Sequence, residues 1–208
     1  MILCDIGNTY FHFYCKGRVW RESPKTLSSK DGEIFYISVN PNYEKLLLEK
    51  QRKCINLAPF FSLDTAYVGL GIDRVAVCEG VDEGVIVDAG SAITVDVMQK
   101  NMHLGGYILP GIGSFVEMYK QISPALDVLP DFSIEFDLFP QNTKEALGYA
   151  ILRSIVGLIT EVAKEKKIYF CGGDGKFFSK FFKNCIYDET LVFKGMQKAW
   201  ERYNEQNF

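Results

Sequence analysis

The sequence predicts an α/β fold made of two duplicated halves, each with a mixed β-sheet and helices, facing each other across a cleft. The main observation is an internal repeat: residues 5–9 read Asp-Ile-Gly-Asn-Thr, and residues 88–92 read Asp-Ala-Gly-Ser-Ala. Each segment follows an apolar run and precedes a strand, a turn and another strand. The boundary is expected in the polar, glycine-rich stretch 79–84, so the predicted domains are residues 1–82 and 83–208.

Most of the first half reads as β-structure. The apolar run 2–6, the aromatic run 10–15 and residues 18–22 are separated by turn signals such as Lys16-Gly17, which predicts an antiparallel meander. Asn40 and Pro41 suit the N-cap and the first position of a helix. The other elements expected in this half are strands at 34–39 and 55–57 and helices at 41–51 and 71–78.

The second half repeats this order and adds longer helices. We expect strands at 84–88, 92–98, 103–109 and 168–171, and helices at 112–122, 143–166, 177–182 and 190–204. The helix at 143–166 is apolar over much of its circumference. Since this is more apolar surface than one small domain needs to cover, the helix predicts a second, intermolecular contact surface.

Composition and charge exclude several classes of function. The 208 residues carry a formal net charge of −3 and the isoelectric point is about 5.5, so no nucleic-acid partner is expected. Six scattered cysteines without a Cys-x-x-Cys pair, and only two histidines, predict reduced thiols and no zinc site. The N-terminus lacks the features of a signal peptide and no apolar run approaches the length of a membrane span, which predicts a cytoplasmic protein without a membrane partner.

The first Asp-Gly segment has the residue types of a phosphate-binding turn. Gly7 lets the backbone approach a phosphate closely because no Cβ atom intervenes. Asn8 and Thr9 add side-chain donors beside the backbone N–H groups. Asp5, at the end of an apolar strand, is placed to hold Mg²⁺ directly or through water. The alternative is an ordinary β-turn with a capping aspartate.

A second copy and a third glycine signal favour nucleotide binding. Asp88, Gly90 and Ser91 repeat the device in the other half, so two turns could hold one triphosphate. The segment 171–175, Cys-Gly-Gly-Asp-Gly, follows a buried strand. This order of Asp, Asp and Gly-Gly resembles the two phosphate loops and the adenosine loop of actin-like ATPases, whose domains are ribonuclease H-like. The resemblance spans the whole chain and implies the same fold.

Further motifs narrow the resemblance. Residues 71–74 read Gly-Ile-Asp-Arg at the start of a helix, residues 105–111 contain Gly-Gly-x-Ile-x-Pro-Gly, and residues 142–146 contain Asn-Thr-x-x-Ala. Together with Asp-x-Gly-Asn-Thr at the N-terminus, this set resembles type III pantothenate kinases. The resemblance implies ATP-dependent phosphorylation of pantothenate to 4'-phosphopantothenate, the first step of coenzyme A biosynthesis. It also implies ATP, Mg²⁺, a monovalent cation (K⁺ or NH₄⁺) and a homodimer.

The resemblance also assigns roles to individual residues. Asp73 matches the general base, and Asp88 matches the ligand of the monovalent cation. The residues that match ATP contacts are Asp5, Ile6, Gly7, Asn8, Thr9, Tyr10, Phe11, His12 and Ser91. The residues that match pantothenate contacts are Tyr67, Gly71, Ile72, Arg74 and Thr143.

Two of these assignments carry alternatives. Relatives often have a Tyr-x-x-Pro segment before the Gly-x-Asp-Arg motif, whereas Tyr67 stands here in a different register. Thr143 matches a substrate contact that reaches across the dimer interface, but it is also a candidate N-cap of the helix that follows.

Three other functions fit parts of the pattern. They are another small-molecule kinase of the same superfamily, a non-catalytic ATP-binding regulator, and a ribonuclease H-type nuclease with two metals. A regulator need not keep Asp5, Asp73 and Asp88 together. The Gly-Asn-Thr turn and the acidic isoelectric point argue against the nuclease.

Overall fold

The computed structural model describes residues 1–207, which form two β-sheets with helices. The first sheet has five strands in the order β3-β2-β1-β4-β5. Its strands are β1 (Ile2–Ile6), β2 (Phe11–Cys15), β3 (Arg18–Glu22), β4 (Ile34–Ser38) and β5 (Cys54–Asn56). The strands β1, β2 and β3 pair antiparallel, and β4 and β5 continue the sheet in parallel. The predicted meander is therefore confirmed.

The second sheet repeats this strand order. Its strands are β7 (Gly84–Ala89), β8 (Ala92–Gln99), β9 (Met102–Pro110), β10 (Ile168–Cys171) and β11 (Cys185–Tyr187), with the short β6 (Asp64–Thr65) at one edge. The order is β11-β10-β7-β8-β9-β6. Without β6, each sheet places its third, second, first, fourth and fifth strands side by side. This topology agrees with the predicted fold class, two similar α/β halves with mixed sheets.

The helices follow the expected positions closely. They are α1 (Pro41–Lys50), α2 (Ile72–Glu79), α3 (Ile112–Ile122), α4 (Thr143–Ala163), α5 (Gly175–Phe178) and α6 (Leu191–Asn207). Short 3₁₀ turns occur at Ala58–Phe60, Pro124–Leu126 and Ser179–Phe181. The helix expected at 177–182 begins earlier, at Gly175, and continues as a 3₁₀ turn. The strands β6 and β11 and the other two 3₁₀ turns were not predicted.

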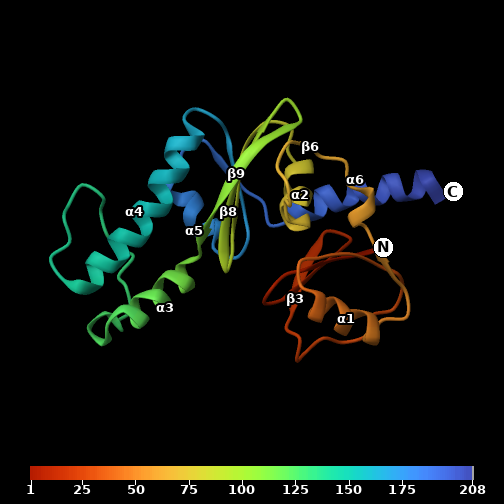
Figure 1. The fold of residues 1–208 in the computed structure, drawn as a ribbon, viewed down its shortest axis with the longest axis horizontal. Coiled ribbons are helices and arrows are strands. Elements are labelled where there is room, and N and C mark those ends of the chain that lie inside the picture. The colour runs from red at the N-terminus through yellow and green to blue at the C-terminus, as the bar shows by residue number, and fades with distance from the viewer. Residues whose placement is uncertain (208) are drawn as a thin grey trace. The chain divides into compact units, whose positions relative to one another are not determined.

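The described residues divide into two compact units. The first contains Met1–Ile86, Asp96–Gly105 and the residues from Asp188 on, and the second contains Val87–Val95 and Gly106–Tyr187. In the first unit, the C-terminal helix α6 runs beside α2, as Figure 1 shows. The last helix of the chain thus completes the unit formed by its first residues.

Side chains alternate along each strand of the first sheet, so successive residues point to opposite faces. Both faces are buried, each in its own hydrophobic cluster. One cluster contains Cys4, Ile6, Phe11, Phe13, Tyr36 and Leu47 of α1. The other contains Leu3, Phe35, Ile37, Ala76 of α2 and Phe193 and Met196 of α6. Asp5 shares the face of Leu3, so the alternation directs it towards the side covered by α2 and α6.

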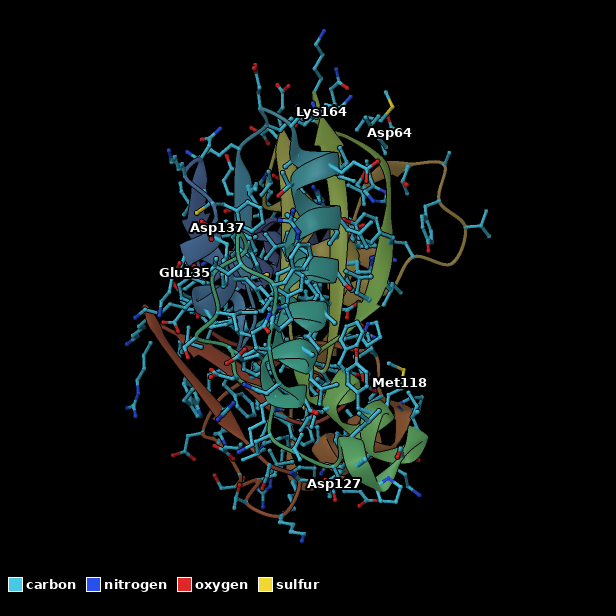
Figure 2. The ribbon with its side chains drawn as sticks, turned by 90° about the vertical axis from the view of Figure 1, so that its left-hand side faces the viewer. Asp64, Met118, Asp127, Glu135, Asp137 and Lys164 are labelled. Atoms are coloured by element: carbon cyan, nitrogen blue, oxygen red, sulfur yellow. The ribbon has the colours of Figure 1, made fainter. Side chains whose placement is uncertain are left out.

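The long helix α4 belongs to the second unit. Asn142 caps it by accepting the N–H of Glu145 at 3.1 Å. Lys164, which Figure 2 labels, follows its last residue and has φ of 49°. The helix is long and apolar enough to cross a membrane, so the expectation that no apolar run reaches that length was wrong. Buried side chains nevertheless line it in the pattern of a core helix: Leu147, Ile151, Leu152, Ile155, Val156 and Ile159.

The packing of α6 on α2 depends on Gly195. A Cβ atom at this position would clash with the backbone oxygen of Ala76. We expect Gly195→Ala to lower the free energy of unfolding by about 1–3 kcal/mol, the usual cost of overpacking.

Urea unfolding, with Gly157→Ala in α4 as the matched control, measures this effect. A Cβ atom at Gly157 would have no neighbour within 4 Å, so no loss is expected there. An unchanged unfolding midpoint for Gly195→Ala would contradict the close approach of the two helices.

Candidate functional site

The first Asp-Gly segment forms a tight hairpin between β1 and β2. The N–H of Gly7 donates to the backbone oxygen of Tyr10 at 3.1 Å, which closes a turn with Asn8 and Thr9 at its exposed tip. Within the described residues, Asp5 Oδ1 is buried and has no hydrogen-bond partner. A buried carboxylate oxygen without a partner fits a hard cation or its water, since such groups are otherwise satisfied.

A row of polar residues crosses the same face of this sheet. The strand register places Asp5 opposite His12 and His12 opposite Arg21. His12 Nδ1 lies 3.7 Å from Asp5 Oδ2, and the Arg21 guanidinium lies 4.5 Å from the centre of the Tyr10 ring. The strand β3, which pairs with the hairpin, therefore carries a positively charged side chain, Arg21. Sequence reasoning missed Arg21, whose position relative to the hairpin appears only once the strands are paired.

Asp73 lies in the first turn of α2, where Gly71 is the N-cap. Its Oδ1 accepts the N–H of Arg74 at 2.8 Å, and a Cβ atom at Gly71 would lie 2.6 Å from this oxygen. Burial raises the pKa of the Asp73 carboxyl above its ordinary value, and the nearby charge of Asp5 raises it further. A half-buried acid with a raised pKa is the kind of group that serves in acid–base catalysis.

Arg74 is buried against a carboxylate instead of facing solvent. It is 5% exposed, and its Nε and Nη2 donate to the two oxygens of the fully buried Asp96 at 3.0 and 2.7 Å. Nη1 lies 3.4 Å from the Tyr67 hydroxyl, and the guanidinium lies 4.9 Å from the centre of the Tyr67 ring. The first unit therefore brings together Tyr67, Gly71, Asp73 and Arg74, four of the residues that the sequence singled out.

Cys78, Asp96 and His103 have ligand atoms within 4.8 Å of one another. Both oxygens of Asp96 already accept hydrogen bonds from Arg74, and the pair with His103 adds a third contact. Burial raises the pKa of the Cys78 thiol, which opposes the thiolate that a metal would require. This cluster is therefore a hydrogen-bonded ion-pair network and not a metal centre.

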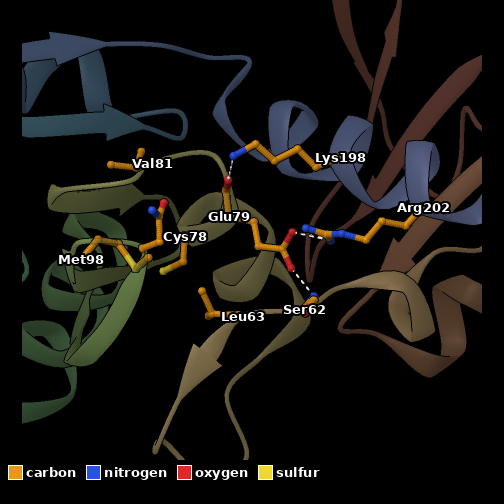
Figure 3. Close-up of a pocket in the computed structure, with 9 residues that line it drawn as sticks. Ser62, Leu63, Cys78, Glu79, Val81, Met98, Lys198 and Arg202 are labelled. Carbon is orange, nitrogen blue, oxygen red and sulfur yellow. Dashed lines mark hydrogen bonds and ion pairs between the residues drawn. The ribbon is translucent and has the colours of Figure 1, made fainter.

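A small cavity of about 120 Å³ opens at the other end of α2. Figure 3 shows Glu79 at its centre, with its carboxylate between Arg202 of α6 and the backbone N–H of Ser62. Lys198 donates to the backbone oxygen of Glu79 at 2.7 Å. The charged side chains around the cavity thus bind one another or backbone groups, and its lining includes none of the residues predicted to bind substrate.

The second Asp-Gly segment is also a hairpin turn, and α3 begins against it. The N–H of Gly90 donates to the oxygen of Ala92 at 3.0 Å. The oxygen of Ser91 accepts from Gly111 N–H at 3.1 Å and from Ser114 Oγ at 2.9 Å. Among residues 1–207, no side chain forms a cap hydrogen bond at the N-terminus of α3. Its first N–H groups therefore lie close to the turn, an arrangement that favours anions.

The glycine-rich segment after β10 packs on the end of β7. The N–H of Asp174 donates to the backbone oxygen of Ala89 at 2.9 Å. Gly172 has φ of +78°, and a Cβ atom there would clash with Asp88 Oδ1. Only glycine combines this backbone conformation with so close an approach. The second unit therefore brings together Asp88, the Ser91 turn and the glycine-rich segment.

Thr143 is the first residue of α4 and is exposed. Asn142 caps the helix, so the alternative interpretation of Thr143 as the N-cap is wrong. It lies at the exposed N-terminal end of α4. Its predicted role in substrate binding stays a prediction.

Comparisons with known proteins show which family this chain resembles. The profile of a family described as type III pantothenate kinase matches residues 16–165. A type III pantothenate kinase from Wolinella succinogenes is 53% identical over 207 residues, 99% of each chain. One from Helicobacter hepaticus is 51% identical over 204 residues, 97% of this chain and 99% of its own.

Two solved structures are also similar. A Campylobacter jejuni protein described as a Baf family transcriptional activator is 42% identical, with a TM-score of 0.87 over 99% of this chain and 100% of its own. The ethanolamine utilization protein EutJ from Carboxydothermus hydrogenoformans is 12% identical, with a TM-score of 0.51 over 95% of this chain and 89% of its own. The latter likeness concerns the fold alone.

Proposed function

The chain belongs to the type III pantothenate kinase family, and from this premise we propose which of its residues carry out the phosphorylation of pantothenate by ATP in coenzyme A biosynthesis. The observation that carries the proposal is the environment of Asp73 at the start of α2. Asp73 is a half-buried acid, and burial and the charge of Asp5 raise its pKa. An ATP-dependent phosphorylation assay with pantothenate, with and without K⁺ or NH₄⁺, tests the activity directly.

Asp73 is proposed as the general base. The primary hydroxyl of pantothenate attacks the γ-phosphorus, a new O–P bond forms, and the bond from that phosphorus to the β–γ bridging oxygen breaks. Asp73 accepts the hydroxyl proton. Such a transfer depends on positioning and charge neutralisation more than on covalent chemistry. The carboxylate therefore orients the hydroxyl and takes its proton, while cations and backbone N–H groups neutralise the phosphate charge.

The hairpin after β1 is proposed to bind ATP. Its contacts are the residues Asp5, Ile6, Gly7, Asn8, Thr9, Tyr10, Phe11 and His12, with Ser91 as a further phosphate contact. Asp5 Oδ1, buried without a partner among the described residues, fits Mg²⁺ or its water. When bound, Mg²⁺ neutralises phosphate charge.

The pantothenate contacts are proposed to be Tyr67, Gly71, Ile72, Arg74 and Thr143. Arg74 directs two N–H groups to Asp96 and a third towards Tyr67. Its remaining donors are suited to the pantothenate carboxylate, because a guanidinium binds carboxylates through its planar donors.

Asp88 is proposed to hold a monovalent cation. It stands near the end of β7, against Gly172, and carboxylate oxygen is a hard ligand that alkali cations accept. We expect the rate to rise and saturate with K⁺ or NH₄⁺ and to stay near its baseline with Na⁺. Initial rates at constant ionic strength measure this dependence, and Asp88→Asn should weaken it. Equal rates with all three cations would contradict the cation site.

A homodimer with shared sites is also proposed. The second unit exposes apolar side chains on three elements: Ile108 of β9, Met118 and Ile122 of α3, and Leu158 of α4. Light scattering should give about twice the 23.6 kDa chain mass. Mixing inactive Asp73→Asn chains with inactive Thr143→Ala chains should restore activity, since one hybrid site would contain both native residues.

The outcomes of the dimer experiment separate two ideas. A fully active monomer would contradict the dimer, whereas a dimer without complementation would contradict the shared site. Independently of these outcomes, we propose that the protein is cytoplasmic. We also propose that residues 1–82 and 83–208 are its two duplicated halves.

A regulator that binds ATP without turnover is the second candidate, because the similar Campylobacter jejuni protein is described as a transcriptional activator. A kinase for another small substrate is the third. A substrate screen with ATP separates them: phosphorylation of pantothenate supports the first proposal, and ATP binding without any acceptor supports the regulator.

A further inference from the structure

Three polar residues of the first unit form a chain behind Arg74 and Tyr67, and the proposed mechanism does not use them. They are Thr65 on β6, Asp96 on β8 and His103 on β9. Asp96 is fully buried and His103 is 2% exposed. His103 Nε2 lies 2.8 Å from Asp96 Oδ1, and Nδ1 lies 2.7 Å from Thr65 Oγ1.

The hydrogen bonds of this chain are mutually consistent. If His103 donates through Nε2 to Asp96, its Nδ1 accepts the hydroxyl proton of Thr65. Thr65 Oγ1 in turn accepts the backbone N–H of Tyr67 at 3.0 Å. Every polar side-chain atom of Thr65, His103 and Asp96 then has a partner. These bonds fix the histidine ring and the Thr65 and Asp96 side chains on either side of it.

The chain ends at Asp96 and Thr65, which hydrogen-bond to Arg74 and Tyr67, two of the residues proposed to bind pantothenate. Asp96 holds Nε and Nη2 of Arg74, which determines where its other donors point. Thr65 holds the backbone of Tyr67, whose ring lies against both the guanidinium and, at 6.0 Å, the His103 ring. Tyr67 is 37% exposed, so its position depends on this backbone hydrogen bond together with its contacts with Arg74 and His103.

We propose that Thr65, His103 and Asp96 are positioning residues that fix Arg74 and Tyr67 in register for the carboxylate end of pantothenate. This inference rests on the proposed function of that site. A buried ion pair is weak evidence for stability, since apolar side chains of similar volume often stabilise a fold as well or better. Because Asp96 binds Arg74, one of the proposed substrate contacts, the pair has a role that packing alone does not require.

The same helix supplies a matched control. Glu79, also on α2, forms a salt bridge at 2.6 Å with Arg202 of α6, and its side chain is 4% exposed. This pair also joins an arginine to a buried carboxylate, although Arg202 is 33% exposed. It lies at the cavity of Figure 3, whose lining includes none of the residues proposed to bind substrate. Arg202→Gln should therefore lower stability without changing substrate binding.

Thr65→Val is the main test. It keeps the shape of the side chain but removes the hydroxyl that links His103 to Tyr67. We expect the KM for pantothenate to rise about 3- to 10-fold, the size of one lost hydrogen bond of about 1 kcal/mol, with kcat and the KM for ATP unchanged. Thr65→Ser should restore the native KM, because it restores the hydroxyl.

Two further variants make the result decisive. His103→Gln breaks the same chain at its centre and should raise the KM for pantothenate in the same way. In an Arg74→Lys background, which already lacks the guanidinium fork, Thr65→Val should have a smaller effect than in the native protein. Such non-additivity indicates that the two residues act through one another.

The outcomes distinguish this inference from the proposed function. Native protein that does not phosphorylate pantothenate contradicts the function itself. Native protein that does, together with Thr65→Val and His103→Gln variants that lose thermal stability but keep the native KM, contradicts the positioning role. A KM that rises equally in Arg202→Gln also contradicts it, because a general loss of stability would then explain the change.

Discussion

Asp73→Asn is expected to lower turnover about 10²–10⁴-fold, the usual range for a lost acid–base group, with little change in ATP binding. The substitution keeps the shape of the side chain and an oxygen that can accept the N–H of Arg74, which Asp73 Oδ1 binds at 2.8 Å. What it removes is the basic oxygen that takes the proton of the attacking hydroxyl. Single-turnover rates, with nucleotide binding measured by calorimetry, separate the two effects.

The stability of Asp73→Asn should not fall. Burial and the charge of Asp5 raise the pKa of Asp73 in the folded protein, so the ionised form is less favourable in the folded state than in the unfolded chain. This unfavourable contribution is present above the folded-state pKa and disappears as the pH falls below the unfolded value. Removing the charge therefore keeps or raises the melting temperature at neutral pH. A folded variant with native turnover would contradict the role of Asp73.

The parts of the site that local sequence patterns encode were predictable. Asp5-x-Gly7 and Asp88-x-Gly90 end apolar strands, and the backbone turns that they form follow from a few neighbouring residues. The helix starts at Ile72 and Ile112 were visible for the same reason. Local patterns do not show that α6, from the other end of the chain, covers the face of the first sheet on which Asp5 lies.

The parts of the site that long-range pairing creates were not predictable. Thr65 and His103 lie 38 positions apart in the sequence and meet only because β6 pairs in parallel with β9. A strand of two residues is too short to show an alternation of apolar and polar residues. The local sequence therefore contained no signal that predicts β6. The sequence alone therefore offered no reason to place His103 beside Thr65, or to single out Asp96 behind Arg74.

Asp5→Asn should change the reaction in two ways. The buried Oδ1 of Asp5 has no partner among the described residues, and it is the proposed contact of Mg²⁺ or its water. Mg²⁺ held there would stabilise the charge of the transferred phosphoryl group, and losing one electrostatic contribution of this kind typically costs about 10²–10³-fold. We expect a loss of this size in kcat/KM for ATP, with partial recovery at raised Mg²⁺ concentration, which initial rates over a Mg²⁺ series would measure.

The second effect of Asp5→Asn concerns pH. Asp73 must be ionised to accept a proton, so activity falls as the pH drops through the pKa of Asp73. The charge of Asp5 raises that pKa. Its removal should therefore move the acid limb of kcat/KM for pantothenate to lower pH. Asp82→Asn, which removes an exposed acid of the same unit, should leave both the rate and the profile unchanged. An acid limb for Asp5→Asn that coincides with that of the native protein would show that the two carboxylates do not interact, and the assignment of the limb to Asp73 would then fail.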